Sequence, residues 1–248
     1  MPLCVAGILP AIRGRDARDT SGATALRSTS SEEGEILKID RLILGAFETN
    51  CYVVRRDETA TECLVIDTGL DGSDLVAFLE EHALTPVAVI LTHGHADHIV
   101  GLAALRQRYP GIKVFIHQLD APLLTDSDAN LSGLAGLTFA TAPADVLLRD
   151  GDVIEEAGLR LQVLHTPGHT LGGICLYAES EGIVFGGDTL FADSVGRTDF
   201  PGGDMDQLIE SIRTKLFTLP DQTAVYPGHG MRTTVGREKR ANPYVQGL

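Results

Sequence analysis

Apolar residues in the first half of the chain occur in short runs separated by turn-forming residues, a pattern typical of β-strands. From Ile36 onward these runs predict an opening antiparallel meander. Its predicted strands are Leu42–Leu44, Cys51–Val54 and Cys63–Ile66. Asp71–Ala83 then places Leu75, Val76 and Leu79 on one face and predicts a helix. The strand Val87–Leu91, of the fully buried type, follows and starts an alternation of strands and helices.

The alternation continues to the end of the chain. A helix is predicted over Ala96–Tyr109, ended by Pro110 and Gly111, and residues 118–144 are left open as a helix, a flexible loop or a lid. The further predicted strands are Lys113–His117, Leu159–Leu164, Ile174–Tyr177, Ile183–Phe185 and Ala224–Tyr226. A last helix is predicted over Met205–Phe217, capped by Asp204 with Gln207 in capping-box register. Two halves of this kind predict two sheets packed face to face with helices outside.

Residues 1–33 differ from the rest of the chain, because arginines are mixed there with Ser, Thr, Gly and Asp. We expect this segment to have no fixed structure and residues 34–248 to form one domain. As a signal peptide it lacks a charged start and a long apolar stretch, and as a transit peptide it has two unfavourable acids, Asp16 and Asp19. A disordered extension or a start codon placed too early is our interpretation.

Composition narrows the possible partners of the 248-residue chain. No apolar run approaches the roughly 20 residues that span a bilayer, so no membrane partner is expected. The formal net charge of −14 argues against nucleic acid, while two divalent cations would return about four positive charges to the site. The four cysteines show no C-x-x-C or zinc-finger spacing, so we expect free buried thiols and a reducing, cytoplasmic location.

Residues 92–98 read Thr-His-Gly-His-Ala-Asp-His, directly between a predicted strand and a predicted helix. His93 and His95 lie two apart in an extended turn, and Asp97 and His98 fall in the first helical turn. Imidazole and carboxylate are ligands of zinc, iron and manganese. The alternative is a polar loop in which Asp97 only caps the helix. Three histidines and one acid within six residues favour the metal site.

Three more candidate ligands lie beside glycines at the ends of predicted strands. They are His169 in Thr-Pro-Gly-His-Thr, Asp188 in Gly-Gly-Asp-Thr and His229 in Pro-Gly-His-Gly. Each alone could be an ordinary turn residue. Together with the first cluster they make five histidines and two acids, a number that suits two adjacent metals with a carboxylate between them.

These motifs resemble the metallo-β-lactamase superfamily and, within it, the short glyoxalase II-like (hydroxyacylglutathione hydrolase-like) branch, over about residues 36–245. The resemblance implies a four-layer αββα sandwich of two mixed sheets. It also implies that one metal takes His93, His95 and His169, that the other takes Asp97, His98 and His229, and that Asp188 bridges them. Asp67, in Val-Ile-Asp-Thr-Gly, matches an acid of the family that orients the ligands without binding metal.

By this resemblance the protein is expected to be a metal-dependent hydrolase of small-molecule thioesters, with Asp97 and Asp188 as catalytic carboxylates. Two divalent ions, zinc or alternatively iron or manganese, would share a hydroxide that attacks the thioester carbonyl. A thiol with a pKa near 8.5 then leaves without help from an acid. The same metals would also polarise lactones, lactams or phosphodiesters. The acyl group, the thiol carrier and the oligomeric state are left open.

Two features depart from the longer glyoxalase II enzymes. The chain ends at Leu248, without most of their C-terminal helical extension, and so resembles short bacterial relatives. The run Gly196-Arg197-Thr198-Asp199-Phe200 also resembles persulfide dioxygenases, which hold a single iron and whose ligands would map to His93, His169 and Asp188. Gly94 and the Pro-Gly-His-Gly sequence around His229 favour the hydrolase.

A third alternative, a non-catalytic metal-binding protein, is disfavoured because it would not need a second metal. The remaining polar residues receive structural interpretations. We expect His82 to lie on the surface and His117 and His165 to be structural, with His165 near the site. We expect Arg197 to pair with Asp193 or Asp199 rather than with substrate.

Overall fold

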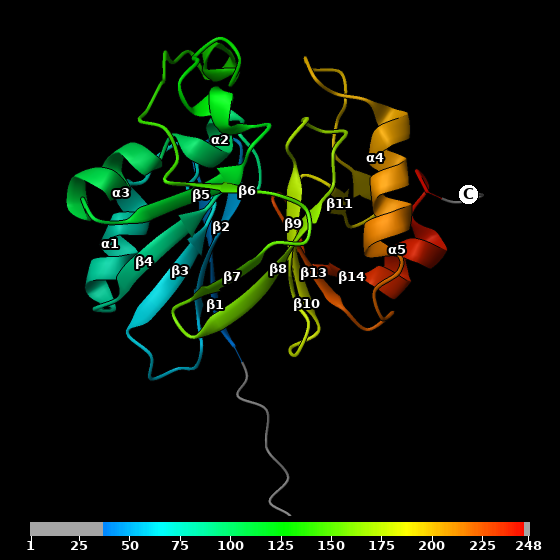
Figure 1. Ribbon diagram of the computed structural model, residues 1–248, viewed down its shortest axis with the longest axis horizontal. Helices are drawn as coiled ribbons and strands as arrows, with labels where there is room; N and C mark the ends of the chain where they lie inside the picture. The colour runs from blue at the N-terminus through cyan, green and yellow to red at the C-terminus, as the bar shows by residue number, and fades with distance from the viewer. Residues whose placement is uncertain (1–36, 246–248) are drawn as a thin grey trace, which may run out of the picture. The chain divides into compact units, whose positions relative to one another are not determined.

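Two β-sheets form the centre of the domain in the computed structural model, which describes residues 37–245 (Figure 1). The segment 1–33, for which no fixed structure was predicted, lies outside the described residues. The first sheet, in spatial order, comprises β1 (Lys38–Leu44), β2 (Thr49–Arg55), β3 (Glu62–Ile66), β4 (Thr85–Ile90), β5 (Lys113–His117) and β6 (Val146–Leu148). The second, in spatial order, comprises β14 (Thr233–Thr234), β13 (Ala224–Pro227), β10 (Ile183–Gly187), β9 (Ile174–Ala178), β8 (Leu159–His165) and β7 (Val153–Glu156). Each sheet contains parallel and antiparallel pairs.

The central strands bury side chains on both faces, which places each sheet between two apolar layers. On β2, Tyr52 and Val54 belong to the core between the sheets, together with Phe185 of β10. The alternate residues Cys51 and Val53 belong to the core on the outer face. Side chains alternate along a strand, so one buried strand supplies both cores.

Helices cover the two outer faces, as Figure 1 shows. Over the first sheet lie α1 (Ser73–Glu81) and α3 (Leu102–Arg108), which bury Leu75 and Leu105 in its outer core. Over the second sheet lie α4 (Met205–Ser211), the π-helical turn η3 (Ile212–Leu216) and α5 (Val235–Ala241). The layers therefore follow the order helix, sheet, sheet, helix, and the predicted αββα fold is confirmed.

The helix predicted over Ala96–Tyr109 is divided into two. The short helix α2 (Ala96–Ile99) ends before Gly101, and α3 begins at Leu102. The carbonyl of His98 accepts hydrogen bonds from the backbone N–H and the hydroxyl of Thr68 (2.8 and 2.9 Å). A side chain at Gly101 would overlap the Thr68 carbonyl. This close packing against the loop after β3 interrupts the helix.

The segment left open by the sequence, 118–144, is mostly loop with two short 3₁₀ helices, η1 (Ala121–Leu124) and η2 (Ser132–Ala135). A small hairpin of β11 (Leu190–Phe191) and β12 (Ser194–Val195) follows β10. The predicted cap at Asp204 is confirmed, because its carboxylate accepts the backbone N–H of Gln207 at 3.0 Å.

The predicted free buried thiols are confirmed for Cys51, Cys63 and Cys175. Burial raises the pKa of the Cys63 thiol to about 12 and that of Cys175 to about 11, so both are protonated at neutral pH. Cys4 lies outside the described residues. Among the described helices, none combines the length and the apolar character needed to cross a bilayer.

Candidate metal centre

All seven predicted ligands lie just beyond the carboxyl ends of strands. His93, His95, Asp97 and His98 follow β4, in the loop that leads into α2. The other three come from the second sheet: His169 follows β8, Asp188 follows β10 and His229 follows β13. These three strands run in the same direction, so their carboxyl ends meet at one edge of the sheet. The site is therefore assembled from both halves of the fold.

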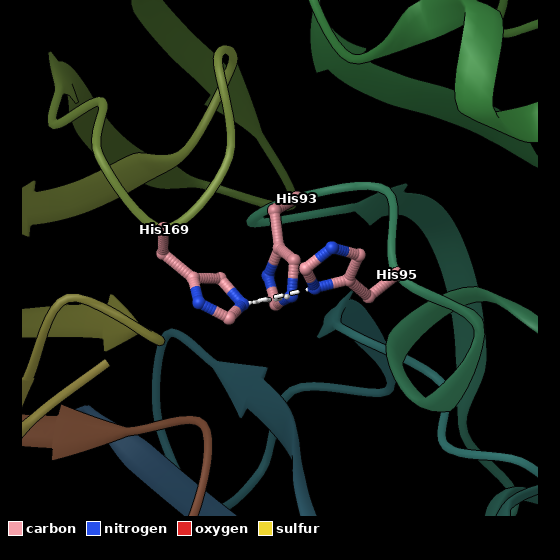
Figure 2. A group of neighbouring side chains, drawn as sticks. All are labelled: His93, His95 and His169. Atoms are coloured by element: carbon pink, nitrogen blue, oxygen red, sulfur yellow. Dashed lines mark hydrogen bonds between the residues drawn. The ribbon is translucent and has the colours of Figure 1, made fainter. Parts of the chain in front are cut away.

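Three histidines form the first cluster. Figure 2 shows the rings of His93, His95 and His169 turned toward one another from two separate loops. The distance from His169 Nε2 to His95 Nδ1 is 2.9 Å, and to His93 Nε2 it is 3.3 Å. Tetrahedral ligands about 2.05 Å from a zinc ion lie roughly 3.3 Å apart. The spacing of these nitrogens therefore suits one bound cation.

The second cluster joins Asp97 and His98 to His229. His229 Nε2 lies 3.2 Å from Asp97 Oδ2 and 3.3 Å from His98 Nε2, and the distance from His98 Nε2 to Asp97 Oδ2 is 3.5 Å. His98 is fully buried, whereas His229 and Asp97 are partly exposed. This cluster is the one more open to solvent.

Asp188 lies between the two clusters. Its Oδ1 is 3.5 Å from His98 Nε2, and its Oδ2 is 3.6 Å from His169 Nε2 and 3.5 Å from His229 Nε2. Oδ1 is buried and has no hydrogen-bond partner among the described residues. A buried carboxylate oxygen is costly unless something compensates its charge, and a cation at this point would do so.

Hydrogen bonds on the far side of three rings fix which nitrogen faces the clusters. Nδ1 of His169 donates to the Arg197 carbonyl (2.7 Å), Nδ1 of His229 to the Phe47 carbonyl (3.0 Å) and Nδ1 of His98 to Asp67 (2.8 Å). Each Nδ1 therefore carries a proton, and each Nε2 is the ring nitrogen directed into the interior of the site. A bound cation would take these three nitrogens in their deprotonated form.

The electrostatics differ between the clusters. Burial and repulsion between neighbouring imidazoles lower the pKa of His95 to about 3 and hold the pKa of His93 well below its ordinary value. Burial also opposes the charged form of His98, but Asp97, Asp67 and Asp188 raise its pKa to about 10. Burial would raise the pKa of Asp97, yet His98 and His229 lower it below the ordinary range. His93 and His95 of the first cluster are thus neutral and Asp97 of the second is ionised, and neutral imidazole and carboxylate are donors suited to divalent cations.

Known proteins are similar to this chain in sequence. A profile of the metallo-β-lactamase superfamily matches residues 44–229. The chain belongs to this superfamily. The probable metallo-hydrolase YqgX of Bacillus subtilis is 37% identical over 86% of this chain and 99% of its own length. The hydroxyacylglutathione hydrolase GloC of Haemophilus influenzae is 35% identical over 84% of this chain and 98% of its own.

Solved structures of other proteins also resemble this fold. BLEG-1 B3 metallo-β-lactamase is 38% identical with a TM-score of 0.80, covering 85% of this chain and all of the other. TTHA1623 in a di-iron-bound form is 38% identical with a TM-score of 0.73, over 83% of this chain and 99% of the other. ETHE1 from Myxococcus xanthus is 35% identical with a TM-score of 0.69, over 85% of both chains. The site is thus the His/Asp metal-binding site of a metallo-hydrolase superfamily.

Asp67 holds the loop of residues 92–98 in place through hydrogen bonds. Its carboxylate accepts the backbone N–H and the hydroxyl of Thr92, each at 2.8 Å, as well as the ring N–H of His98. Asp67 has a left-handed φ of +57°, which is uncommon for a residue other than glycine. Asp67 therefore carries backbone strain at the point where it fixes Thr92 and His98 of the ligand loop.

Sequence reasoning missed Asp120, a fully buried acid that joins the ligand loops of the two sheets. Its carboxylate accepts the backbone N–H of Gly94 (3.0 Å), the hydroxyl of Thr170 (2.8 Å) and the backbone N–H of Gly172 (2.6 Å). Gly94 separates two ligand histidines, and Thr170 follows His169. The one sequence signal was its place just beyond β5, whose carboxyl end lies beside that of the parallel strand β4.

Replacing Asp120 with alanine is expected to weaken metal binding by roughly 10–100-fold, the usual effect of removing a group that orients ligands. Asp120→Asn should fall between alanine and wild type, because one amide oxygen can replace only part of a carboxylate that accepts three hydrogen bonds. Chelator competition measures the affinity. Asp128→Ala, at an exposed acid of the same segment, is the control. Equal affinities for all variants would contradict the bracing role.

Asn50 and Tyr52 were also missed, and both hold the loop that carries His229. The Asn50 amide donates to the carbonyls of Pro227 (2.8 Å) and Gly230 (3.0 Å), and the Tyr52 hydroxyl donates to Pro227 at 2.6 Å. Both residues belong to β2 of the opposite sheet. No motif marks them, since their role depends on the packing of one sheet against the other.

The remaining histidines lie as predicted. His82 is exposed and stacks on Phe78. His117 and His165 stack on each other with ring centroids 4.1 Å apart, and His165 Nε2 lies 2.9 Å from the carbonyl of Leu171, in the loop that carries His169. The pair therefore has a structural role beside the site.

A cleft of about 500 Å³ opens over the metal centre. Five candidate ligands reach it: His95, Asp97, His169, Asp188 and His229. Arg197 lies in its wall, where both nitrogens of one guanidinium edge donate to Asp199 at 2.8 Å. The predicted pair of Arg197 with Asp199 is confirmed.

Proposed function

We propose that this protein hydrolyses thioesters of glutathione-type or related thiols with two divalent cations. His93, His95 and His169 would hold one cation, Asp97, His98 and His229 the other, and Asp188 both. The hydroxyacylglutathione hydrolase GloC, similar along nearly its whole length, supports this substrate class. Zinc is the proposed metal, with iron or manganese as alternatives, since a similar protein holds two irons.

The observation that carries the proposal is the convergence of three imidazole nitrogens on Asp188. Three imidazoles have their Nδ1 atoms engaged outward, so their Nε2 atoms face the carboxylate of Asp188. The carboxylate oxygen Asp188 Oδ1 is buried there without a hydrogen-bond partner in residues 37–245. This arrangement is expensive for the protein alone, and cations would compensate it.

When bound, the two cations would lower the pKa of water and polarise the substrate carbonyl. The protein groups have separate tasks. Asp97 is ionised, faces the cleft and accepts the Thr49 hydroxyl at 3.3 Å, so its carboxylate can hold the attacking water. Asp188 fixes the separation of the two sites. The leaving thiol, with a pKa near 8.5, departs as a thiolate and needs no acid.

Metal content and substrate turnover test the proposal together. Protein purified without added metal should hold about two metal ions per chain by elemental analysis, and it should cleave S-lactoylglutathione. Removal of the metals with a chelator should abolish turnover, and zinc should restore it. Turnover of a β-lactam without turnover of any thioester would overturn the proposal.

A second candidate is oxidation of a glutathione persulfide at a single iron held by His93, His169 and Asp188. The run Gly196–Phe200 favours it, and the similarity to the ETHE1 structure agrees with it. This alternative requires one iron per chain and oxygen uptake with glutathione persulfide. Metal content and oxygen uptake, measured on the same preparation, therefore distinguish the two functions.

A further inference from the structure

The wall of the cleft beside the metal centre is apolar. Its large apolar side chains are Phe47, Leu131, Leu134, Phe191 and Phe200. Leu134 is 63% exposed and Phe47 48%. Single exposed apolar residues are common, but several around one cavity form a patch of the kind that binds ligands.

Two of these residues, Leu131 and Leu134, lie on a short segment that we call the leucine ledge (residues 130–134). Buried polar side chains hold this ledge in place. The Asn130 amide donates to the carbonyls of Leu123 (3.0 Å) and Phe139 (2.8 Å), and its oxygen accepts the Ser132 N–H at 3.0 Å. Leu131 has a left-handed φ of +65°, a strained conformation for leucine. A strained residue fixed by its neighbours at a cleft is a mark of a functional position.

The ledge is attached to the helix that carries the metal ligands. The backbone N–H of Ala96 donates to the Asn130 carbonyl at 2.8 Å. Ala96 immediately precedes Asp97, so this bond fixes the ledge relative to the second cluster. A group bound on the ledge would therefore adjoin the reacting carbonyl.

The charge of the lining disfavours a strongly anionic group at this wall. Apart from the histidines, Arg197 is the sole cation among the described residues that line the cleft. Its guanidinium is already paired with Asp199 and lies over the Phe200 ring, 3.9 Å from the centroid. The net charge of −14 also disfavours the binding of an anionic group.

We propose that the leucine ledge binds an aliphatic arm of the substrate, attached to the thioester either at the carbonyl or at the sulfur. This inference rests on the proposed thioester hydrolysis and specifies its substrate class. Leu131 and Leu134 determine the specificity, and the metal centre supplies the reaction. Short polar thioesters, S-lactoylglutathione among them, are then cleaved with a lower kcat/KM than those with alkyl chains.

Two series of thioesters test the ledge on the full-length metal-loaded protein. One series is acetyl, butanoyl, hexanoyl and octanoyl N-acetylcysteamine. The other is the thioacetates of ethane-, butane-, hexane- and octanethiol. In the series whose arm lies on the ledge, kcat/KM should rise by up to roughly fourfold per methylene, the factor for burying one CH₂ group. A rise in either series supports the proposal and identifies the arm.

A variant and its matched control assign the effect to the ledge. Leu134→Ser should reduce the ratio of octyl to short-chain kcat/KM by roughly tenfold, because the lost leucine contact acts only on the longer chain. Leu137→Ser is the control, since Leu137 is also exposed (42%) but does not line the cleft. It should leave the ratio unchanged.

Binding of non-hydrolysable amide analogues of both series, measured by calorimetry, separates this inference from the proposed function. If no thioester is cleaved but amide affinity still rises with chain length in wild type and not in Leu134→Ser, thioester hydrolysis is wrong and the ledge stands. If thioesters are cleaved while neither kcat/KM nor amide affinity depends on chain length, the ledge is overturned and the function stands. An equal chain-length dependence in wild type and Leu134→Ser would also overturn the ledge.

Discussion

Replacing Asp188 with asparagine is expected to lower kcat/KM for thioester hydrolysis by at least roughly 10²–10³-fold, the loss seen when one electrostatic stabiliser is removed. The two carboxylate oxygens face different clusters, with Oδ1 near His98 and Oδ2 near His169 and His229. An amide keeps the shape but removes the negative charge and replaces one oxygen with a donor. The binding of two cations should therefore suffer with turnover. Elemental analysis and steady-state kinetics measure both effects.

Asp221→Asn is the matched control, because Asp221 is an exposed acid paired with Arg240 on the surface. It should leave metal content and turnover unchanged. If Asp188→Asn kept two metals and full turnover, Asp188 would not bridge the centre. A non-catalytic metal-binding protein would have no turnover in the wild type to lose.

Gly228→Ala should lower kcat/KM nearly as much as Asp188→Asn does, although it adds only a methyl group. A Cβ at this position would lie 2.2 Å from Asp188 Oδ1 and 2.8 Å from His98 Cε1. The backbone cannot retreat, because the Gly228 N–H donates to Gly187 and its carbonyl accepts from Asn50. Asp188 or His98 must then move, and a shift of about 1 Å at such a site costs roughly 10²-fold in rate. Metal content, kinetics and thermal unfolding measure the consequences.

Gly111→Ala is the control for Gly228→Ala, since a Cβ at Gly111 meets nothing within 4 Å. It should preserve metal content, turnover and the melting temperature. Full activity of Gly228→Ala with two bound metals would show that the loop can yield, and it would remove the steric argument for the fixed position of Asp188.

Most of the longer strands were predictable because they carry apolar residues that a sheet must bury. β6 has only three residues, too few to show a period, and α5 buries Val235 and Glu238 in an otherwise polar sequence. The division of α2 from α3 depends on Thr68, which is distant in sequence from the helix that it interrupts. Such elements are decided by contacts between segments and not by local pattern.

The candidate ligands were identified from the sequence because their chemistry is concentrated in short motifs. The residues that brace them were not, since Asp120 and Asn50 act through backbone groups of loops far away in the chain. An acid or amide that binds main chain leaves no signature in its own neighbours. Topology could have indicated Asp120, and the packing of the two sheets was needed for Asn50.

The candidate ligands come from segments far apart in the chain, since His98 and His229 are separated by 131 positions. A competent centre therefore exists only after the sheets have docked, since neither sheet alone supplies a complete set. Cations would then bind late in folding, and their binding would stabilise the packing of one sheet against the other.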